Sequence, residues 1–184
     1  MKIVNILSMR LRKDGSKNMI IDFIEHKNIS ENELEKICTL KKQHWDYSIQ
    51  EQIQWIHNNL TINDVHLLLR NTEGILFGYL NLIKLSVILD VKSTDMIGIG
   101  NVCVDKNYQN NQYGFFLMKT SEYYLRKNMI NGILLCKKKL IPFYDTIRWN
   151  RFNGITKINE SVFNGVVYVY DEIFSNEIII NKNF

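Results

Sequence analysis

The stretch that decides the fold is Val102-Cys103-Val104-Asp105-Lys106-Asn107-Tyr108-Gln109-Asn110-Asn111-Gln112-Tyr113-Gly114. Its first three residues are apolar and predict a buried strand, and the polar residues that follow predict a loop. An amphipathic helix is expected over residues 112–127. The N-terminus of a helix has unpaired backbone N–H groups and the positive end of the helix dipole, and both attract an anion. The stretch therefore predicts an anion-binding turn between a strand and a helix.

A second informative stretch, Pro142-Phe143-Tyr144, follows about thirty residues later. Proline is favoured in the first turn of a helix, so Tyr144 is expected near a helix N-terminus. A phenol has an ordinary pKa near 10 and keeps its proton at neutral pH, so it can protonate a departing group. The alternative is a tyrosine that only packs in the core.

The rest of the chain predicts alternating strands and helices. Two capping signatures, Ser30 with Glu33 and Ser48 with Glu51, predict helices over 30–42 and 48–60. A further helix is expected from Pro142. Strands are expected at residues 20–25, 65–70, 75–85 with an extension to 91, 96–104, 133–136, 166–170 and 178–180. This order predicts an α+β, or mixed α/β, fold with a sheet of six or seven strands.

Composition limits the classes of function and the number of domains. The chain has 184 residues, one proline and a net charge of +4, and no linker divides it. We expect a single domain over 19–184, with 1–18 as an N-terminal arm or an extra strand. The scattered lysines do not predict a nucleic-acid partner, and no apolar run predicts a membrane span or a signal peptide. Cys38, Cys103 and Cys136 lack metal-site spacing, so we expect no metal and a reducing, cytoplasmic location.

With these two motifs in this order of elements, the sequence resembles the GNAT superfamily of acyl-CoA-dependent N-acyltransferases over roughly residues 20–170. The resemblance implies a GNAT-like central mixed sheet of six to seven strands flanked by about four helices. Val102-Cys103-Val104 matches the apolar triplet that ends a strand in that family. Residues 109–114 match the family's (Gln/Arg)-x-x-Gly-x-(Gly/Ala) motif at Gln109 and Gly114. Gln112 stands where the family usually has glycine.

The resemblance also implies a co-substrate, acetyl-CoA or another acyl-CoA, and the residues that bind it. The pyrophosphate would be held by Gln109, Asn110, Asn111, Gln112, Tyr113 and Gly114. The pantetheine arm and the thioester carbonyl would bind the backbone of Val102, Cys103 and Val104. Tyr144 would be the general acid. Because the turn is tight, Asn110 and Asn111 are the residues best able to adopt a positive φ. Cys103 is interpreted as strand packing rather than as a nucleophile.

The amine acceptor needs a base and a pocket, and the segment between the first two helices offers both. Histidine is the usual general base near neutral pH, so His44 is the candidate base, and His44, Asp46 and Tyr47 are candidate substrate-binding residues. The alternative is an ordinary helix C-terminus. His57, His66 and Asp95 are further candidates for the base, and Gly98 and Gly100 could leave room beside a strand for the acceptor or thioester.

We therefore expect an enzyme that moves an acyl group, most simply acetyl, directly to the primary amine of a small molecule. An amino-sugar or sugar nucleotide is the first expectation for that molecule, by family analogy. Two alternatives stay open, a protein or peptide amine acetyltransferase and a non-catalytic GNAT-like binding or sensor module. The last strand, near 177–180, could pair internally or with a second copy in a homodimer.

Overall fold

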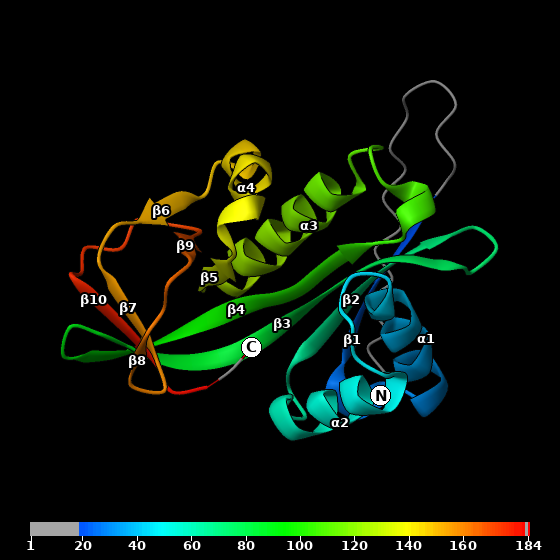
Figure 1. Ribbon diagram of the computed structural model, residues 1–184, viewed down its shortest axis with the longest axis horizontal. Helices are drawn as coiled ribbons and strands as arrows, with labels where there is room; N and C mark the ends of the chain where they lie inside the picture. The colour runs from blue at the N-terminus through cyan, green and yellow to red at the C-terminus, as the bar shows by residue number, and fades with distance from the viewer. Residues whose placement is uncertain (1–18, 183) are drawn as a thin grey trace. The chain divides into compact units, whose positions relative to one another are not determined.

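The computed structural model describes residues 19–182 and 184, so the arm or extra strand predicted for 1–18 lies outside the described residues. The chain forms two compact units (Figure 1). The first contains the described residues up to Asn81 together with Asn101–Leu117, and the second contains Leu82–Gly100 and the chain from Met118. Three elements contribute to both units: β3 (Leu76–Leu89), β4 (Lys92–Val104) and α3 (Tyr113–Asn128).

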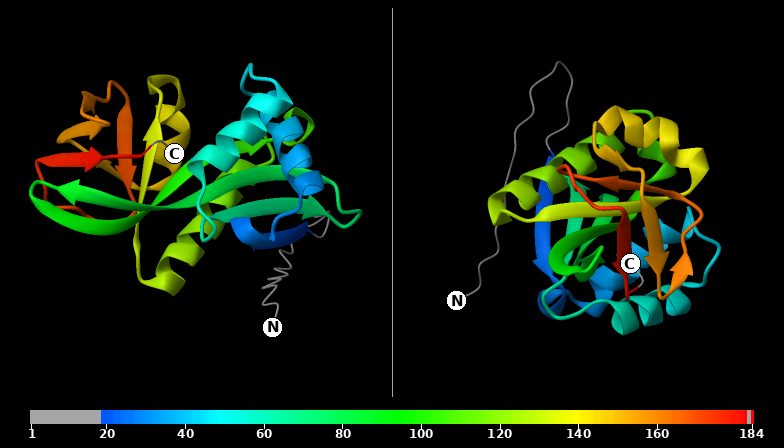
Figure 2. Two further views of the ribbon diagram at one scale, coloured as in Figure 1. Left: turned by 90° about the horizontal axis from the view of Figure 1, so that it is seen from below. Right: turned by 90° about the vertical axis from the view of Figure 1, so that its left-hand side faces the viewer.

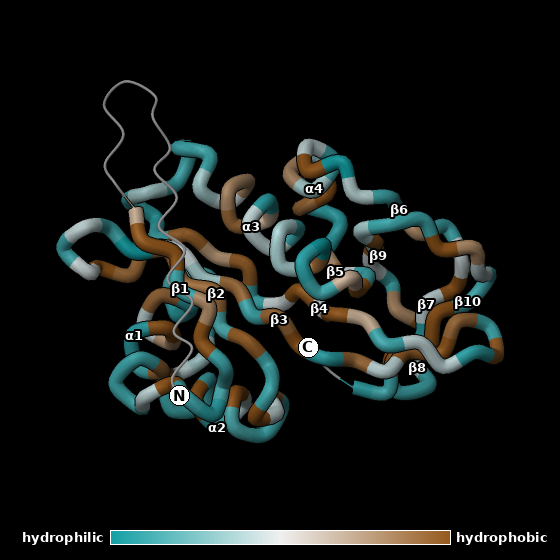
Figure 3. The backbone as a smooth tube through the Cα atoms, turned by 180° about the vertical axis from the view of Figure 1, so that it is seen from behind, coloured by the Kyte–Doolittle hydropathy of each residue, from teal (hydrophilic) through white to brown (hydrophobic). Residues whose placement is uncertain are grey.

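The first unit packs two helices on a small antiparallel sheet. Strand β1 (Met19–Glu25) pairs with β2 (Val65–Asn71), which pairs with β3. Helices α1 (Glu31–Lys42) and α2 (Ile49–Asn59) contact each other. Their inward faces and strand β2, which is strongly hydrophobic in Figure 3, bury apolar side chains away from water. Two short 3₁₀ helices, η1 (His26–Asn28) and η2 (Lys106–Tyr108), complete this unit.

Both predicted capping serines begin helices, and one of the two capping boxes is complete. The Ser48 hydroxyl accepts from the Glu51 N–H at 3.1 Å, and the Glu51 carboxylate accepts from the Ser48 N–H at 2.7 Å. The Ser30 hydroxyl accepts from the Glu33 N–H at 3.2 Å, but the Glu33 carboxylate is bound by Lys36 and Arg70 instead. An ion pair with the neighbouring strand therefore replaces half of the first box.

The second unit is built on a mixed sheet in the order β6-β9-β5-β4-β3-β10-β7-β8. Its remaining elements are β5 (Asn131–Cys136), η3 (Lys138–Leu140), α4 (Ile141–Ile147), β6 (Asn150–Phe152), β7 (Ile155–Ile158), β8 (Ser161–Val162), β9 (Val166–Val169) and β10 (Glu177–Ile180). Strand β5 is parallel to β4 and antiparallel to β9. Strand β10, red in Figure 2, pairs with β3 on one side and with β7 on the other. The last strand thus pairs internally on both edges.

The mixed α/β class and the four helices are confirmed, while the described residues form ten strands rather than six or seven. The additional strands β6, β7 and β8 have only two to four residues each. Such short strands carry no clear period, and they form because neighbouring strands pair with them. Among the helices of the described chain, none combines the length and the apolar content that crossing a membrane requires.

Candidate functional site

Strand β4 changes its backbone conformation just before the apolar triplet. Asn101 has φ 54, a left-handed conformation that interrupts the regular pleat of a strand. Beyond it, Cys103 and Val104 are buried. The Asp105 N–H donates to the Phe77 carbonyl at 2.8 Å and fixes the end of β4 against β3. Sequence reasoning missed this irregularity, although a lone asparagine in an apolar strand was a signal for it.

The loop between β4 and α3 presents free backbone donors. Asn110 has φ 63, as expected, but the second left-handed residue is Gln112 (φ 62) rather than Asn111. The Asn111 side chain instead donates to the Gln109 carbonyl at 3.0 Å. Among the described residues, no acceptor bonds the backbone N–H groups of 109–114. Left-handed residues alternating with right-handed or extended ones turn successive N–H groups toward one side, which forms an anion-binding concavity. The local geometry therefore fits a diphosphate.

Three aromatic rings fix this loop to the first unit. The Phe77 ring is buried in β3 and stacks on Tyr108 with the ring centroids 4.6 Å apart. It also meets the edge of Tyr113 at 4.8 Å. Because Tyr108 precedes the loop and Tyr113 begins α3, one buried ring holds both of its ends.

The segment between α1 and α2 is attached to the end of β4. His44 Nε2 donates to the Val104 carbonyl at 2.8 Å, which leaves Nδ1 as the nitrogen able to accept a proton when the ring is neutral. Gln43 Nε2 donates to Asp105 at 2.7 Å. His44 therefore lies beside the apolar triplet, and His44, Asp46 and Tyr47 are all exposed. The predicted catalytic role of His44 and the predicted substrate contacts of all three residues stay predictions.

Tyr144 lies in α4 with its side chain buried, at 7% exposure. Burial raises the pKa of Tyr144, and the nearby Cys136 and Tyr168 raise it further. Among the described residues, none hydrogen-bonds the Tyr144 hydroxyl. The side chain therefore keeps its proton at neutral pH and has it available, as a general acid requires. The predicted catalytic role itself stays a prediction.

A polar cluster next to Tyr144 fixes α4 to β9. Asp145 accepts from the Tyr168 hydroxyl at 2.7 Å and from Arg151 Nε at 3.0 Å. The Arg151 guanidinium lies 5.9 Å from the centroid of the Tyr168 ring. These contacts join α4, β6 and β9, and they restrict the position of the helix that carries Tyr144.

The space beside Gly98 is filled, contrary to what the sequence suggested. A Cβ atom at this position would lie 2.5 Å from Cδ2 of Phe184 and 2.7 Å from Cδ1 of Leu85. The glycine admits the chain's own aromatic ring against β4. The side chains of Phe184 and Leu85 therefore occupy the space directly beside Gly98.

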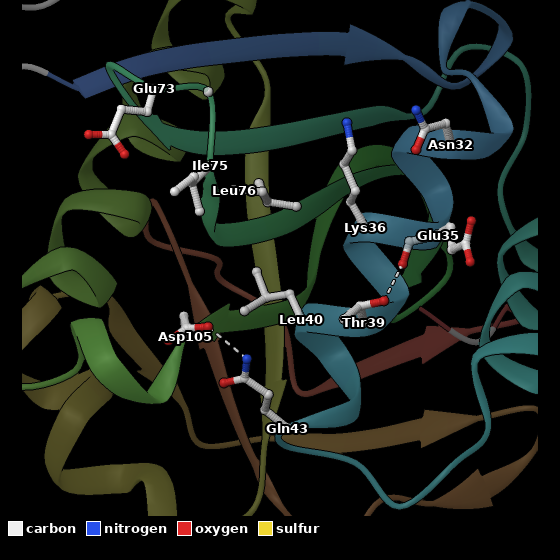
Figure 4. Close-up of a pocket in the computed structure, with 11 residues that line it drawn as sticks. Asn32, Glu35, Lys36, Thr39, Leu40, Gln43, Glu73, Ile75, Leu76 and Asp105 are labelled. Carbon is white, nitrogen blue, oxygen red and sulfur yellow. Dashed lines mark hydrogen bonds between the residues drawn. The ribbon is translucent and has the colours of Figure 1, made fainter.

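A pocket of about 490 Å³ opens in the first unit between α1, the β2–β3 turn and the end of β4 (Figure 4). Its lining residues are Asn32, Glu35, Lys36, Thr39, Leu40, Gln43, Glu73, Gly74, Ile75, Leu76 and Asp105. Leu40 and Leu76 lie in the middle of the view in Figure 4, with Lys36 and Glu73 toward its upper edge. Among the described residues, three carboxylates and one ammonium line the pocket, so the net charge of this lining favours a cationic guest.

Cys103 is buried in strand β4. Burial raises the pKa of Cys103 to about 12, so the thiol is protonated and a poor nucleophile at neutral pH. This agrees with the interpretation of Cys103 as strand packing. In the part of the chain that the structure describes, no three His, Cys, Asp or Glu side chains are grouped as a metal ion would need.

Comparison with protein families and known structures places this geometry in context. The model of the family described as "Acetyltransferase (GNAT) family" matches residues 31–146. A search of curated proteins finds no match.

Three solved structures share the fold at low sequence identity. One is an acyl-CoA N-acyltransferase from Pseudomonas aeruginosa (TM-score 0.62, 13% identity, covering 84% of this chain and 100% of that chain). Another is the GNAT family N-acetyltransferase YhbS from Escherichia coli in complex with CoA (TM-score 0.62, 15% identity, covering 93% and 94%). A third is a GCN5-related glucosamine N-acetyltransferase region of a fungal multi-domain β-N-acetylglucosaminidase (TM-score 0.60, 12% identity, covering 77% and 18%).

Proposed function

Because the chain belongs to the GNAT acetyltransferase family, we propose that it transfers an acetyl group from acetyl-CoA directly to the primary amine of a small molecule. The observation that carries this proposal is the turn of unpaired N–H groups at 109–114, between the apolar triplet of β4 and helix α3. Strands β3 and β4 and helix α3 each contribute to both units, which supports one acyltransferase domain over 19–184.

Each group of site residues has its own proposed role. The N–H groups of 109–114 hold the pyrophosphate, and the backbone of Val102–Val104 holds the pantetheine arm and the thioester carbonyl. Bound acetyl-CoA supplies an activated thioester. Tyr144 donates its proton to the sulfur as the thiolate departs, and a raised pKa keeps that proton available. His44 is the proposed base at the acceptor, through Nδ1.

The acceptor is proposed to be a cationic amine such as an amino-sugar. His44, Asp46 and Tyr47 would bind this amine. Among the described residues that line the adjacent pocket, Glu35, Glu73 and Asp105 are negative and Lys36 is positive, so the lining is negative overall. A negative lining attracts an ammonium group and repels a sugar nucleotide, so an aminoglycoside-like amine fits better. The glucosamine N-acetyltransferase region among the structures of similar fold is consistent with this class. A basic peptide is the main competing acceptor.

The first test measures binding and turnover separately. Acetyl-CoA should raise the melting temperature according to its concentration over Kd. Thiol release from acetyl-CoA should then increase with one member of a panel of D-glucosamine, kanamycin, spermidine and a lysine-containing peptide. Binding without turnover across the panel would favour the sensor module. No binding would remove acetyl-CoA from the proposal.

Tyr144→Phe tests the general acid. Loss of one positioned proton donor should lower turnover about 100-fold, within the usual range for acid–base catalysis. The thermal shift with acetyl-CoA should stay unchanged, because the variant keeps the ring and the loop at 109–114. Tyr170→Phe is the matched control, since Tyr170 is half-buried in the same unit and packs on Trp149. Equal turnover of the two variants would remove Tyr144 from this role.

A further inference from the structure

A buried chain of three polar side chains crosses the first unit. The Tyr79 hydroxyl, in β3, lies 2.9 Å from His66 Nδ1, in β2. His66 Nε2 lies 3.0 Å from Nδ1 of His26, in η1. Tyr79 and His66 have no exposed surface, whereas His26 is partly exposed. The three residues therefore form a hydrogen-bonded path from the interior to the surface.

This path has two consistent hydrogen-bond patterns when both rings are neutral. In one, Tyr79 donates to His66 and His66 donates to His26. In the other, His26 donates to His66 and His66 donates to Tyr79. Moving one proton across each hydrogen bond converts the first pattern into the second, because each imidazole accepts at one nitrogen and donates from the other. Such a chain passes one proton without any side chain moving, and the first hydrogen-bond pattern must be restored before the next turnover.

The inner end of the chain carries an amide that lacks partners. Tyr79 and Asn81 are two residues apart in β3, so their side chains lie on the same face of the strand. The Asn81 amide is near enough to act on the pKa of Tyr79, but neither its Nδ2 nor its Oδ1 reaches hydrogen-bond geometry with a described residue. Asn81 has no exposed surface. A buried amide left without partners indicates a missing ligand or water at this place.

The inner end also lies beside the apolar triplet of β4. Cys103, the middle residue of the triplet, interacts electrostatically with Tyr79. The Asp105 N–H bonds the Phe77 carbonyl, so the end of β4 lies along the part of β3 that precedes Tyr79. The chain therefore ends next to the segment proposed to hold the thioester.

The charges around the chain keep it neutral. Burial, and then His26 and Lys41, lower the pKa of His66 to about 3. Burial and His57 lower the pKa of His26, against the opposite effect of Asp64 and Glu31. Burial raises the pKa of Tyr79, as do Cys103 and Cys38. At pH 7 the Nδ1 atom of His26 can therefore accept a proton, and the ring loses it readily to water.

We propose that Asn81 and Tyr79 contact the reacting amine or the water bound to it, and that Tyr79, His66 and His26 carry its proton to solvent. This inference rests on the proposed acyl transfer. An ammonium loses two protons on its way to an amide. His44, the proposed base, takes one of them, which balances the proton that Tyr144 gives to the thiolate, and the other must leave the site.

The second proton leaves in four linked steps. As the C–N bond forms and the C–S bond breaks, the nitrogen gives a proton to the Tyr79 oxygen. The Tyr79 hydroxyl proton moves to His66 Nδ1, and the His66 Nε2 proton moves to His26 Nδ1. His26 then releases its Nε2 proton to water. Protonation of His26 in acid blocks the last acceptor, so turnover should fall as the pH drops below the pKa of His26.

The test compares turnover against pH for the wild type, Tyr79→Phe, His66→Gln, His44→Gln and the control Tyr170→Phe. The readout is thiol release from acetyl-CoA with the best amine of the panel named above. Tyr79→Phe and His66→Gln should each lower kcat at least 10-fold at pH 7 and remove the acid limb attributed to His26. Tyr170→Phe should keep both the rate and the profile.

Three outcomes overturn the proposal. If no amine is acetylated, the proposed function fails and the relay fails with it. If an amine is acetylated but Tyr79→Phe behaves like Tyr170→Phe, the relay alone fails. If only His44→Gln alters the profile, the proton leaves through His44 and not through Tyr79.

A readout without turnover checks the chain itself. Nitrogen NMR of the imidazoles should show His66 neutral between pH 5 and 8 in the wild type, with one protonated nitrogen. Tyr79→Phe should shift the His66 Nδ1 resonance and leave that of His44 unchanged. A His66 ring that titrates within this range would contradict the buried hydrogen-bonded chain.

Discussion

Gln112 adopts a backbone conformation that glycine adopts at no cost. Its φ of 62 places an L-residue in the left-handed region, where the side chain crowds the backbone. Its side chain is exposed. The glycine usual at this position of the family is explained by the same geometry.

Gln112→Gly should therefore stabilise the protein and improve the anion site. We expect the free energy of unfolding to rise by about 1 kcal/mol and Kd for acetyl-CoA to fall several-fold. Urea denaturation and calorimetric titration measure the two effects. Asn111→Gly is the matched control, because Asn111 has no positive φ and should gain nothing. Equal effects at 111 and 112 would contradict the assignment of strain to Gln112.

The sequence located residues whose positions depend on local structure. It missed contacts between residues that are far apart in the chain. The loop at 109–114 and Tyr144 are positioned by local strand–loop–helix patterns, which a sequence shows directly. The bond from His44 to Val104 and the chain from Tyr79 to His26 join residues far apart in sequence. Such contacts arise only when β2, β3 and β4 are aligned, so no local pattern predicts them.

At the scale of single elements, the two capping serines offer a matched comparison. Ser48 takes part in two hydrogen bonds with Glu51, whereas Ser30 forms one with Glu33. Ser48→Ala and Ser30→Ala each remove one hydroxyl hydrogen bond and should each lower the free energy of unfolding by about 1 kcal/mol. In Ser48→Ala the backbone N–H of residue 48 still donates to Glu51, so Ser48→Ala combined with Glu51→Ala should lose more than Ser48→Ala alone. Urea denaturation of the variants measures this, and equal losses in the single and double variants would show that the reciprocal bond contributes nothing.

The elements that the sequence predicted are those with a clear hydrophobic pattern. Helices α1, α2 and α3 and strands β2, β3 and β4 have clear periods and begin or end close to the expected residues. Strands β6, β7 and β8 escaped prediction because they are short and contain exposed residues such as Arg151 and Val162. They are strands because of their pairing: β6 pairs with β9, β7 with β10, and β8 with β7.

At the scale of the whole molecule, the buried imidazole of His66 predicts how the free energy of unfolding depends on pH. The pKa of His66 is lowered to about 3 in the folded protein, whereas the unfolded chain has the ordinary value of 6.5. The unfolded state therefore binds more protons between these values, and stability falls as the pH decreases below 6.5. From this group alone we expect a loss of about 2 kcal/mol between pH 6.5 and pH 5.

Urea denaturation at pH 7 and at pH 5 measures this loss. His66→Gln should flatten the dependence, because it removes the group that takes up the proton on unfolding. His57→Gln is the control, since His57 is an exposed histidine whose removal leaves His66 in place. A slope that persists in His66→Gln would show that other groups govern acid unfolding.

Strand β10 has a consequence for how the protein is made. Residues 177–180 are inserted between β3 and β7, so the sheet of the second unit has a missing member until these residues leave the ribosome. During translation the exposed edges of β3 and β7 can bind other extended chains. Nascent chains stalled before residue 177 should therefore recruit chaperones, and release of the last strand should end that association.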